Sequence, residues 1–318
     1  MKTVIYDDYR QCQRLWEKMW PTKSIFDLWQ TRSCFHESFF KPLRFYTVEQ
    51  GNEIVGFLPL SWDEQSDSYI QFPGEIWQGK TWIEQNQIIG KNTKAIRTLL
   101  DSVPGSIHLR YLTKNSLLDR FDFIKQDEIG YLFFPGIFDF SFDKYLFCFS
   151  GKSRKKIKNE LQKLEEVSFR INSIKDLEHM FAMNIDSFSE NSYFSDARFY
   201  DSFERLASFL MEMGMLRITT ILVGGKIAAV DMGAIFKNTY TLLAGGTNPE
   251  FPGIAKLINL HHLEWSCQKK FDTVDFLCGD FNWKERFHLS PRPLYEINIE
   301  KTTPFFDKDI YKENTVCV

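Results

Sequence analysis

A repeated hairpin pattern constrains the fold of this chain more than any other feature. Residues 44–56 read RFYTVEQGNEIVG and residues 217–229 read RITTILVGGKIAA, at a constant offset of 173 residues (217 − 44 and 224 − 51). In both segments a β-rich run ends at a glycine, which accepts positive φ, and a second run returns. Two interpretations follow: any two hairpins look alike, or a lobe is duplicated so that two similar α/β units make one molecule.

The length and composition agree with two globular units. A chain of 318 residues suits roughly two domains, and we expect them to span residues 1–145 and 146–318. Aromatic residues make up 16% of the chain, which excludes a disordered protein. The formal net charge of −3 excludes nucleic-acid binding by bulk positive charge.

Nothing in the sequence indicates a membrane span, a secretory signal or a metal site. The apolar run 131–138 is interrupted by Pro135 and Gly136, and it is far shorter than the roughly 20 residues of a span. The first ten residues contain no apolar signal segment. None of the six cysteines forms a CxxC pair or lies at metal-ligand spacing from a histidine. We therefore expect a reduced, cytoplasmic protein without a metal.

Periodicity predicts alternating helices and strands. The first forty residues are predicted to be helical, and further helices are predicted at 93–103, 153–166, 176–187, 197–213 and 253–270. The predicted strands are 44–50, 53–60, 69–72, 107–112, 217–223, 226–236, 240–246, 273–277 and 294–299. The expected fold class is α/β, with mixed, largely antiparallel sheets flanked by helices.

A strand, a short loop and a helix follow one another between residues 240 and 270. Such a helix start presents N–H groups without intrahelical partners and the positive end of the helix dipole, so it can bind an anion. In the loop 250–255, Gly253 lets the backbone approach a ligand and Ala255 keeps the first turn small. The alternative is that Pro252 and Gly253 simply begin a helix.

Several blocks in residues 150–290 resemble a known family. They are GKSRKK at 151, MLRI at 215 with GGKIAA at 224, GGTNPE at 245, and VDFLCGD at 274 followed by Trp283-Lys284. In order and spacing they resemble the BioF2-like or CelD-like acetyltransferase domain, with Trp283 in place of the usual tyrosine. That domain belongs to the GCN5-related N-acetyltransferase (GNAT) superfamily and is close to the FemABX peptidyl transferases.

The resemblance implies a tandem GNAT-like fold and acyl transfer from acetyl-coenzyme A (acetyl-CoA) or another acyl-CoA. The acceptor would be an amine or hydroxyl of a small molecule, sugar or cell-envelope precursor, attacking in a ternary complex. The strand ending at Gly246 would lie beside the acyl group. The pyrophosphate would bind at the helix start, formed by Pro252, Gly253, Ile254, Ala255 and Lys256.

Four residues are candidates for the chemistry. Asp275 ends a strand, where α/β proteins place functional groups, or it caps a turn. Asp280 and Lys284 could act as general base and anion anchor, or form an i,i+4 ion pair. Asp231 interrupts an apolar strand and is either a general base or a solvent-facing residue.

Two other functions remain open. One is a FemABX-like transferase that uses aminoacyl-tRNA, and the other is a non-catalytic ligand-binding protein on a GNAT scaffold. Five basic residues lie within seven positions and form either a solvated helix face or an anion-binding surface: Lys152, Arg154, Lys155, Lys156 and Lys158.

Overall fold

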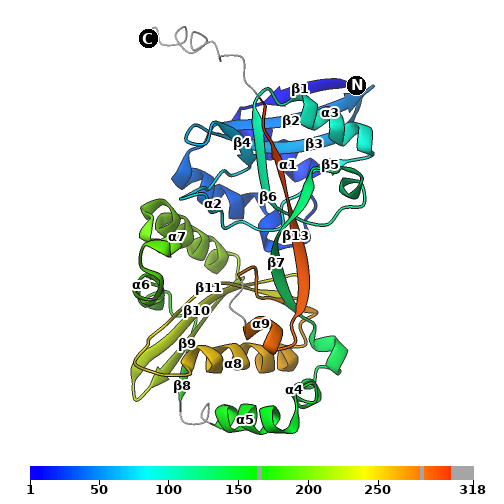
Figure 1. The fold of residues 1–318 in the computed structure, drawn as a ribbon. Helices are drawn as coiled ribbons and strands as arrows, with labels where there is room; N and C mark the ends of the chain where they lie inside the picture. Colours follow the sequence, from blue (N-terminus) through cyan, green and yellow to red (C-terminus); the bar gives the residue numbers. More distant parts are fainter. Residues whose placement is uncertain (163–166, 280–282, 302–318) are drawn as a thin grey trace, which may run out of the picture.

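A computed structural model describes residues 1–162, 167–279 and 283–301, and its described strands join into one 13-stranded sheet (Figure 1). From one edge to the other, the order is β1 (Lys2–Tyr6), β2 (Leu43–Gln50), β3 (Glu53–Asp63), β4 (Ser68–Gln71), β6 (Ser106–Leu112), β13 (Ser290–Ile299), β7 (Ile124–Phe133), β12 (Thr273–Asp275), β11 (Thr239–Thr247), β10 (Lys226–Phe236), β9 (Leu216–Val223) and β8 (Ser168–Ile171). The short β5 (Ile89–Gly90) pairs with β3. The pairs β4–β6 and β11–β12 are parallel and the others antiparallel, which confirms the predicted mixed sheet.

The repeated hairpins have the same geometry. In the β2–β3 hairpin, the pair next to the turn is Gln50 with Glu53, and the register shifts by one residue between Val48 and Glu49. In the β9–β10 hairpin, the pair next to the turn is Val223 with Lys226, and the register shifts between Ile221 and Leu222. The two shifts are 173 residues apart, the same offset as the repeat. The repeat therefore extends to the bulge, which adds an unpaired residue to one strand and increases the local twist.

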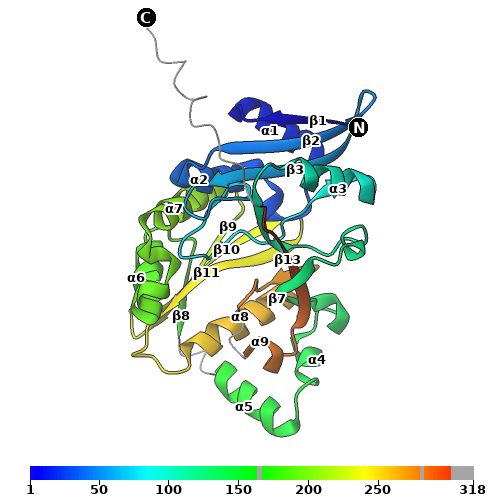
Figure 2. The ribbon, with the colours of Figure 1, turned by 45° about the horizontal axis from the view of Figure 1, so that its top comes forward.

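Helices cover both faces of the sheet in each half of the chain (Figures 1 and 2). The described α-helices are α1 (Tyr9–Met19), α2 (Trp29–Phe39), α3 (Thr93–Ser102), α4 (Phe142–Leu146), α5 (Gly151–Gln162), α6 (Asp176–Phe188), α7 (Ala197–Glu212), α8 (Ile254–Lys269) and α9 (Trp283–Arg286). Helices α6 and α7 lie on one side of β9–β11 and α8 lies on the other (Figure 2). A Cβ at Gly246 would meet Met180 of α6, whereas one at the neighbouring Gly245 would point to the opposite face.

The two halves share a hydrophobic core. Helix α2 packs against α7, where the ring of Phe35 meets that of Phe203 edge-on at a centroid distance of 5.7 Å. Trp82 stacks on Phe35 and also contacts Phe203. Apolar contact between the halves leaves little freedom for them to move apart.

Strands β7 and β13 run from one half of the molecule to the other (Figure 1). β13 comes from the end of the chain, yet it pairs with β6 and β7 of the first half. The sequence did not predict β5, β7 or β8, and it started the last strand four residues late. The helical prediction for the first forty residues is wrong at residues 2–6, which form β1. The domain boundary at residue 145 stays a prediction. The last described strand, β13, pairs with two strands that precede this boundary.

Most predicted elements are confirmed, including the helices at 93–103, 176–187 and 197–213. The helix predicted at 153–166 is confirmed as far as residue 162, and residues 163–166 lie outside the described part. Within the described residues, no helix is both long and apolar enough to cross a bilayer.

Candidate active site

Strands β11 and β12 diverge soon after they meet. Their ladder joins only residues 239–241 to residues 273–275. A cavity of about 650 Å³ occupies the opening beyond this ladder. From the second half of the chain its lining includes Leu242 to Thr247 on β11, Phe276 to Gly279 after β12, and Ala255, Ile258 and Asn259 on α8. The strand that ends at Gly246, which the family resemblance places beside the acyl group, therefore borders an opening in the sheet.

Helix α8 begins beside this opening without a side-chain cap. Its N-cap residue is Gly253, with φ of 87°, and a Cβ there would meet nothing within 4 Å. This turn favours glycine, because a positive φ strains any residue that has a Cβ. Ile254 is buried against the core, and Pro252, Gly253 and Ala255 are exposed. The Ile254 amide donates to the Phe251 carbonyl at 3.2 Å, and no side chain caps the amides that follow it in the first turn.

A second cavity of about 560 Å³ lies between α5, α8 and α9. It shares Ala255, Asn259 and Trp283 with the first cavity, so the two meet at the start of α8. Its described lining has three cations and three aromatic rings, without a carboxylate: Lys156, Lys256, Arg286, Phe149, Trp283 and Phe287. Cations beside aromatic faces suit a ligand that carries phosphates and a planar ring.

Asp231 of β10 is 4% exposed and borders the first cavity. Its Oδ2 lies 2.9 Å from Nε2 of His262 on α8. The hydroxyl of Tyr240 lies 3.5 Å from Nδ1 of the same imidazole, and burial followed by the Asp231 charge raises the Tyr240 pKa well above its ordinary value. Asp231 therefore faces α8 and is hydrogen-bonded inside the protein, rather than facing solvent.

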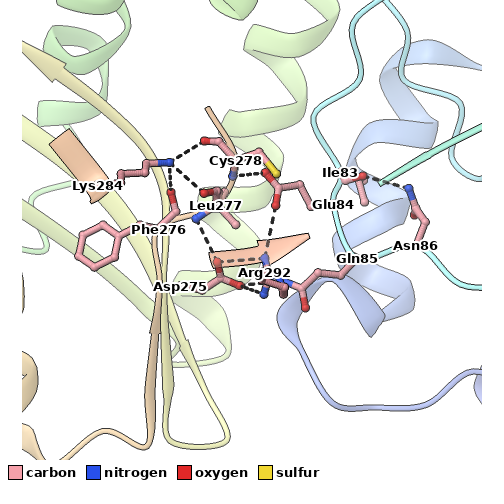
Figure 3. A network of polar contacts seen from close by, with 10 residues as sticks. All are labelled: Ile83, Glu84, Gln85, Asn86, Asp275, Phe276, Leu277, Cys278, Lys284 and Arg292. Atoms are coloured by element: carbon pink, nitrogen blue, oxygen red, sulfur yellow. Dashed lines mark hydrogen bonds and ion pairs between the residues drawn. The ribbon is translucent and has the colours of Figure 1, made fainter. Parts of the chain in front are cut away.

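Asp275 and residues of the first half form one polar network (Figure 3). Asp275 Oδ2 accepts from Arg292 Nη1 at 2.7 Å and from Gln85 Nε2 at 2.9 Å. Its Oδ1 accepts from the Leu277 amide at 3.0 Å, as the turn-capping alternative requires. On the other side of Arg292 lies Glu84, whose Oε1 accepts from the Cys278 amide at 2.6 Å.

Lys284 holds the loop that follows β12. Its Nζ donates to the carbonyl oxygens of Phe276, Leu277 and Cys278 at 2.9, 2.9 and 2.7 Å (Figure 3). The side chain is 4% exposed, and burial lowers its pKa to about 8. The ammonium thus fixes the path of the chain at the mouth of the opening. Asp280, the other candidate in this loop, lies outside the described residues.

The sequence did not point to Glu84, Gln85 or Arg292. Glu84 is 4% exposed and lines the first cavity, and burial together with the charge of Asp275 raises its pKa to about 7. These residues lie in an irregular loop of the first half and in a proline-rich strand. Only the sheet brings them within reach of Asp275, so no local motif could have identified them.

The corresponding opening in the first half is filled. β4 and β6 pair in parallel over residues 68–70 and 106–108 and then separate. The guanidinium of Arg32 lies behind them and donates to the carbonyl of Phe72 and to Asn86 Oδ1, which leaves a cavity of only about 100 Å³. The helix after this opening, α3, is capped by Asn92, whose side chain accepts from the Ala95 amide. In the second unit the strand pair therefore opens onto a cavity and the helix start has no side-chain cap. In the first unit the opening is filled and the helix start is capped.

Comparisons with known proteins agree with this geometry. A family model described as "Acetyltransferase (GNAT) domain" matches residues 151–285. A conserved protein of unknown function from Bacteroides thetaiotaomicron VPI-5482 has the same fold, at TM-score 0.59 and 11% identity, over 94% of this chain and 100% of that one. FemX superposes at TM-score 0.57 and 11% identity, over 94% and 98% of the two chains. L-PGS from Bacillus licheniformis superposes at TM-score 0.55 and 11% identity, over 94% of each chain. No curated protein matches the chain in sequence.

The fold and the site together define the class of protein. Two α/β units with the same hairpin register stand side by side, and the second has a strand pair that opens onto an uncapped helix start. This arrangement is a tandem GNAT-like fold. Residues 151–285 match the model of the GNAT domain, which supports the GNAT superfamily for this part of the chain.

Proposed function

We propose that the chain is an acyl-CoA-dependent acyltransferase, an N- or O-acetyltransferase acting on an amine or hydroxyl of a small molecule, sugar or cell-envelope precursor. The observation that carries the proposal is the contrast between the two units. The opening beside β11 holds a cavity of about 650 Å³ and ends at an uncapped helix, whereas the opening beside β4 is filled by Arg32.

The residues fit the donor from one end to the other. Amides in the first turn of α8 bind the pyrophosphate, because the glycine at position 253 leaves them uncovered. Lys156, Lys256 and Arg286 pair with phosphates in the second cavity, and Trp283 offers a face to the adenine ring. A bound acyl-CoA supplies an activated thioester carbonyl at the opening beside β11.

The three described catalytic candidates shape this site. Asp231 fixes His262 and thereby the packing of α8 on β10. Asp275 and Lys284 position the loop after β12, through Arg292 and through three carbonyl groups. A loop held in this way keeps the opening at a constant width, which positions a reacting carbonyl.

Calorimetry with CoA, acetyl-CoA and charged tRNA tests the proposal. We expect both CoA compounds to bind, and Lys256→Ala to weaken CoA about tenfold, which corresponds to about 1.4 kcal/mol. Lys94→Ala is the matched control, since Lys94 lies in the first turn of α3, the capped helix of the first half. Absence of CoA binding, or equal effects of the two variants, would contradict the proposal.

The alternative is a FemABX-like transferase that takes its acyl group from aminoacyl-tRNA. The fold shared with FemX and the basic run on α5 favour this candidate. Its signature is binding of charged tRNA without binding of CoA, with a steep loss of affinity as salt rises. Binding of neither ligand would favour the non-catalytic scaffold.

A further inference from the structure

An exposed basic surface lies at the end of the molecule opposite the first half. Helices α4 and α5 lie at this end, and the 3₁₀ helix Pro135–Phe138 packs against α4 (Figures 1 and 2). Residues 137–158 contain six basic and two acidic residues, which gives them a formal net charge of +4 in a chain whose total is −3. Five exposed residues of this segment form what we call the α4–α5 surface: Ile137, Lys144, Phe147, Lys152 and Lys155.

Helix α5 turns two lysines away from the protein. Ile157 is buried and packs in the same core cluster as Tyr145 of α4. Because successive residues of a helix are about 100° apart, Lys152 and Lys155 lie on the side of α5 opposite Ile157. Within the described part of the chain, neither lysine forms an ion pair. Their charges are therefore available to an anionic partner.

The two carboxylates of the segment are already paired with other cations. Lys144 Nζ lies 2.6 Å from Asp139 Oδ2, and Lys158 Nζ lies 3.5 Å from Asp143 Oδ1. These ion pairs account for both acidic residues between 137 and 158. No acidic residue of the segment is left to offset the two outward lysines.

Two large apolar side chains are exposed beside these charges. Phe147 is 71% exposed and Ile137 is 70% exposed. Among the described phenylalanines only Phe40, in the first half, is more exposed, at 76%. Phe147 follows Lys144 by three residues at the end of α4, and the Arg154 guanidinium carbon lies 4.6 Å from its ring centroid. The ring of Phe147 is thus surrounded by cations and solvent rather than by the core.

This combination fits a lipid surface better than a nucleic acid. A single exposed apolar residue needs no explanation, but two of them here accompany a strong local excess of positive charge. An anionic bilayer offers negative head groups to the lysines and an apolar phase to the two side chains. RNA offers the negative charge, but it has no apolar phase for an isoleucine.

We propose that the α4–α5 surface is a peripheral docking site for an anionic lipid bilayer. Lys152 and Lys155 face the lipid phosphates, and Phe147 and Ile137 enter the boundary between head groups and acyl chains. Each basic residue near such a surface strengthens binding about fivefold. The five residues of the surface line neither of the two cavities, so docking is separate from binding of the acyl donor.

Sedimentation of the full chain with vesicles tests the apolar contact. The probes are vesicles of phosphatidylcholine alone and vesicles that also contain phosphatidylglycerol. We expect the anionic vesicles to bind at least about tenfold more tightly, with a loss of affinity as salt rises. Phe147→Ala should weaken this binding about fivefold. Phe40→Ala is the matched control, an exposed phenylalanine of the first half, and should leave the binding unchanged.

A charge reversal tests the contribution of α5. The double variant Lys152→Glu, Lys155→Glu should remove the preference for anionic vesicles, because two attractive charges become repulsive. The matched control reverses two exposed lysines of the first half, Lys114→Glu and Lys125→Glu, and should keep the preference. All four lysines are exposed, so both double variants are expected to fold, and circular dichroism checks this.

Equal binding to the two kinds of vesicle, no sedimentation with either, or equal effects of Phe147→Ala and Phe40→Ala overturns the proposal. Equal effects of the two double variants overturn it as well. Binding of tRNA that is tighter than binding of anionic vesicles, and is unchanged in Phe147→Ala, assigns the surface to a nucleic acid and also overturns the lipid site. If Phe147→Ala does not fold, Ile137→Ala decides the apolar contribution. None of these results depends on whether the protein binds CoA.

Discussion

A methyl group at position 245 should disrupt the buried carboxylate of Asp231. The Cβ of Gly245→Ala would lie 2.2 Å from Asp231 Oδ1, so the carboxylate must turn and its 2.9 Å contact with His262 must break. The lost charge-assisted hydrogen bond costs about 1.5–3 kcal/mol. Overpacking of a tight site adds about 1–3 kcal/mol. We expect the free energy of unfolding to fall by roughly 2.5–6 kcal/mol.

A double-mutant cycle isolates this cause. In an Asp231→Ala background the clashing oxygen is gone, so adding Gly245→Ala should cost about 1 kcal/mol or less. Urea unfolding followed by tryptophan fluorescence measures all four proteins. Gly253→Ala serves as a control, since its new methyl meets no atom within 4 Å and only the backbone strain of φ 87° remains, at about 1–2 kcal/mol. Additive costs of the two substitutions would refute the assignment of this contact.

Two further results are expected. Lys284→Met should lower the free energy of unfolding by about 3 kcal/mol, because the carbonyl groups of Phe276 and Cys278 lose this donor and the Leu277 carbonyl keeps only the Tyr131 amide. The exposed Lys269→Met should not lower it. Thermal unfolding checks this, and equal melting temperatures of the two variants would show that Lys284 does not stabilise the loop. Burial lowers the pKa of His36 to about 4, so the folded state holds this imidazole neutral while the unfolded state protonates it below about 6.5. The free energy of unfolding should therefore decrease as the pH is lowered from about 6.5 to 4, by up to roughly 1.4 kcal/mol per pH unit. His36→Gln should make this dependence on pH less steep, and an unchanged dependence would contradict the assignment.

Local patterns explain which elements were predictable. The hairpins around Gly51 and Gly224 combine apolar runs with turn residues, and such signals act between neighbours in the sequence. β8 alternates polar and apolar residues, but it has only four residues and is mostly exposed, so the pattern is too short to indicate a strand. The last strand starts at Ser290, but Pro291 and Pro293 cannot donate to a ladder and made its first residues unlike a strand.

The candidate site was predictable only in part. The helix start at Gly253 and the strand that ends near Gly246 could be predicted from the residues next to them in the sequence. In the structure, Gly246 lines the main cavity and Gly253 begins α8 beside it. The part played by Lys284 did not follow, because the three carbonyl groups that it holds depend on how the chain turns after β12. Glu84 lies 194 residues from its partner Cys278, a distance at which sequence patterns carry no information.

The sequence by itself determined the elements, their order and the repeat, because periodicity, glycine turns and helix starts are set by residues close together in the chain. The tertiary structure alone decided which of two similar openings is available to a ligand. In the first half a buried arginine fills the space and an asparagine caps the helix, while in the second half a glycine leaves the helix start uncovered. The two caps are local, but the filling is not: Arg32 meets Phe72 and Asn86 only after distant segments pack, since burial and charge compensation are properties of the folded chain.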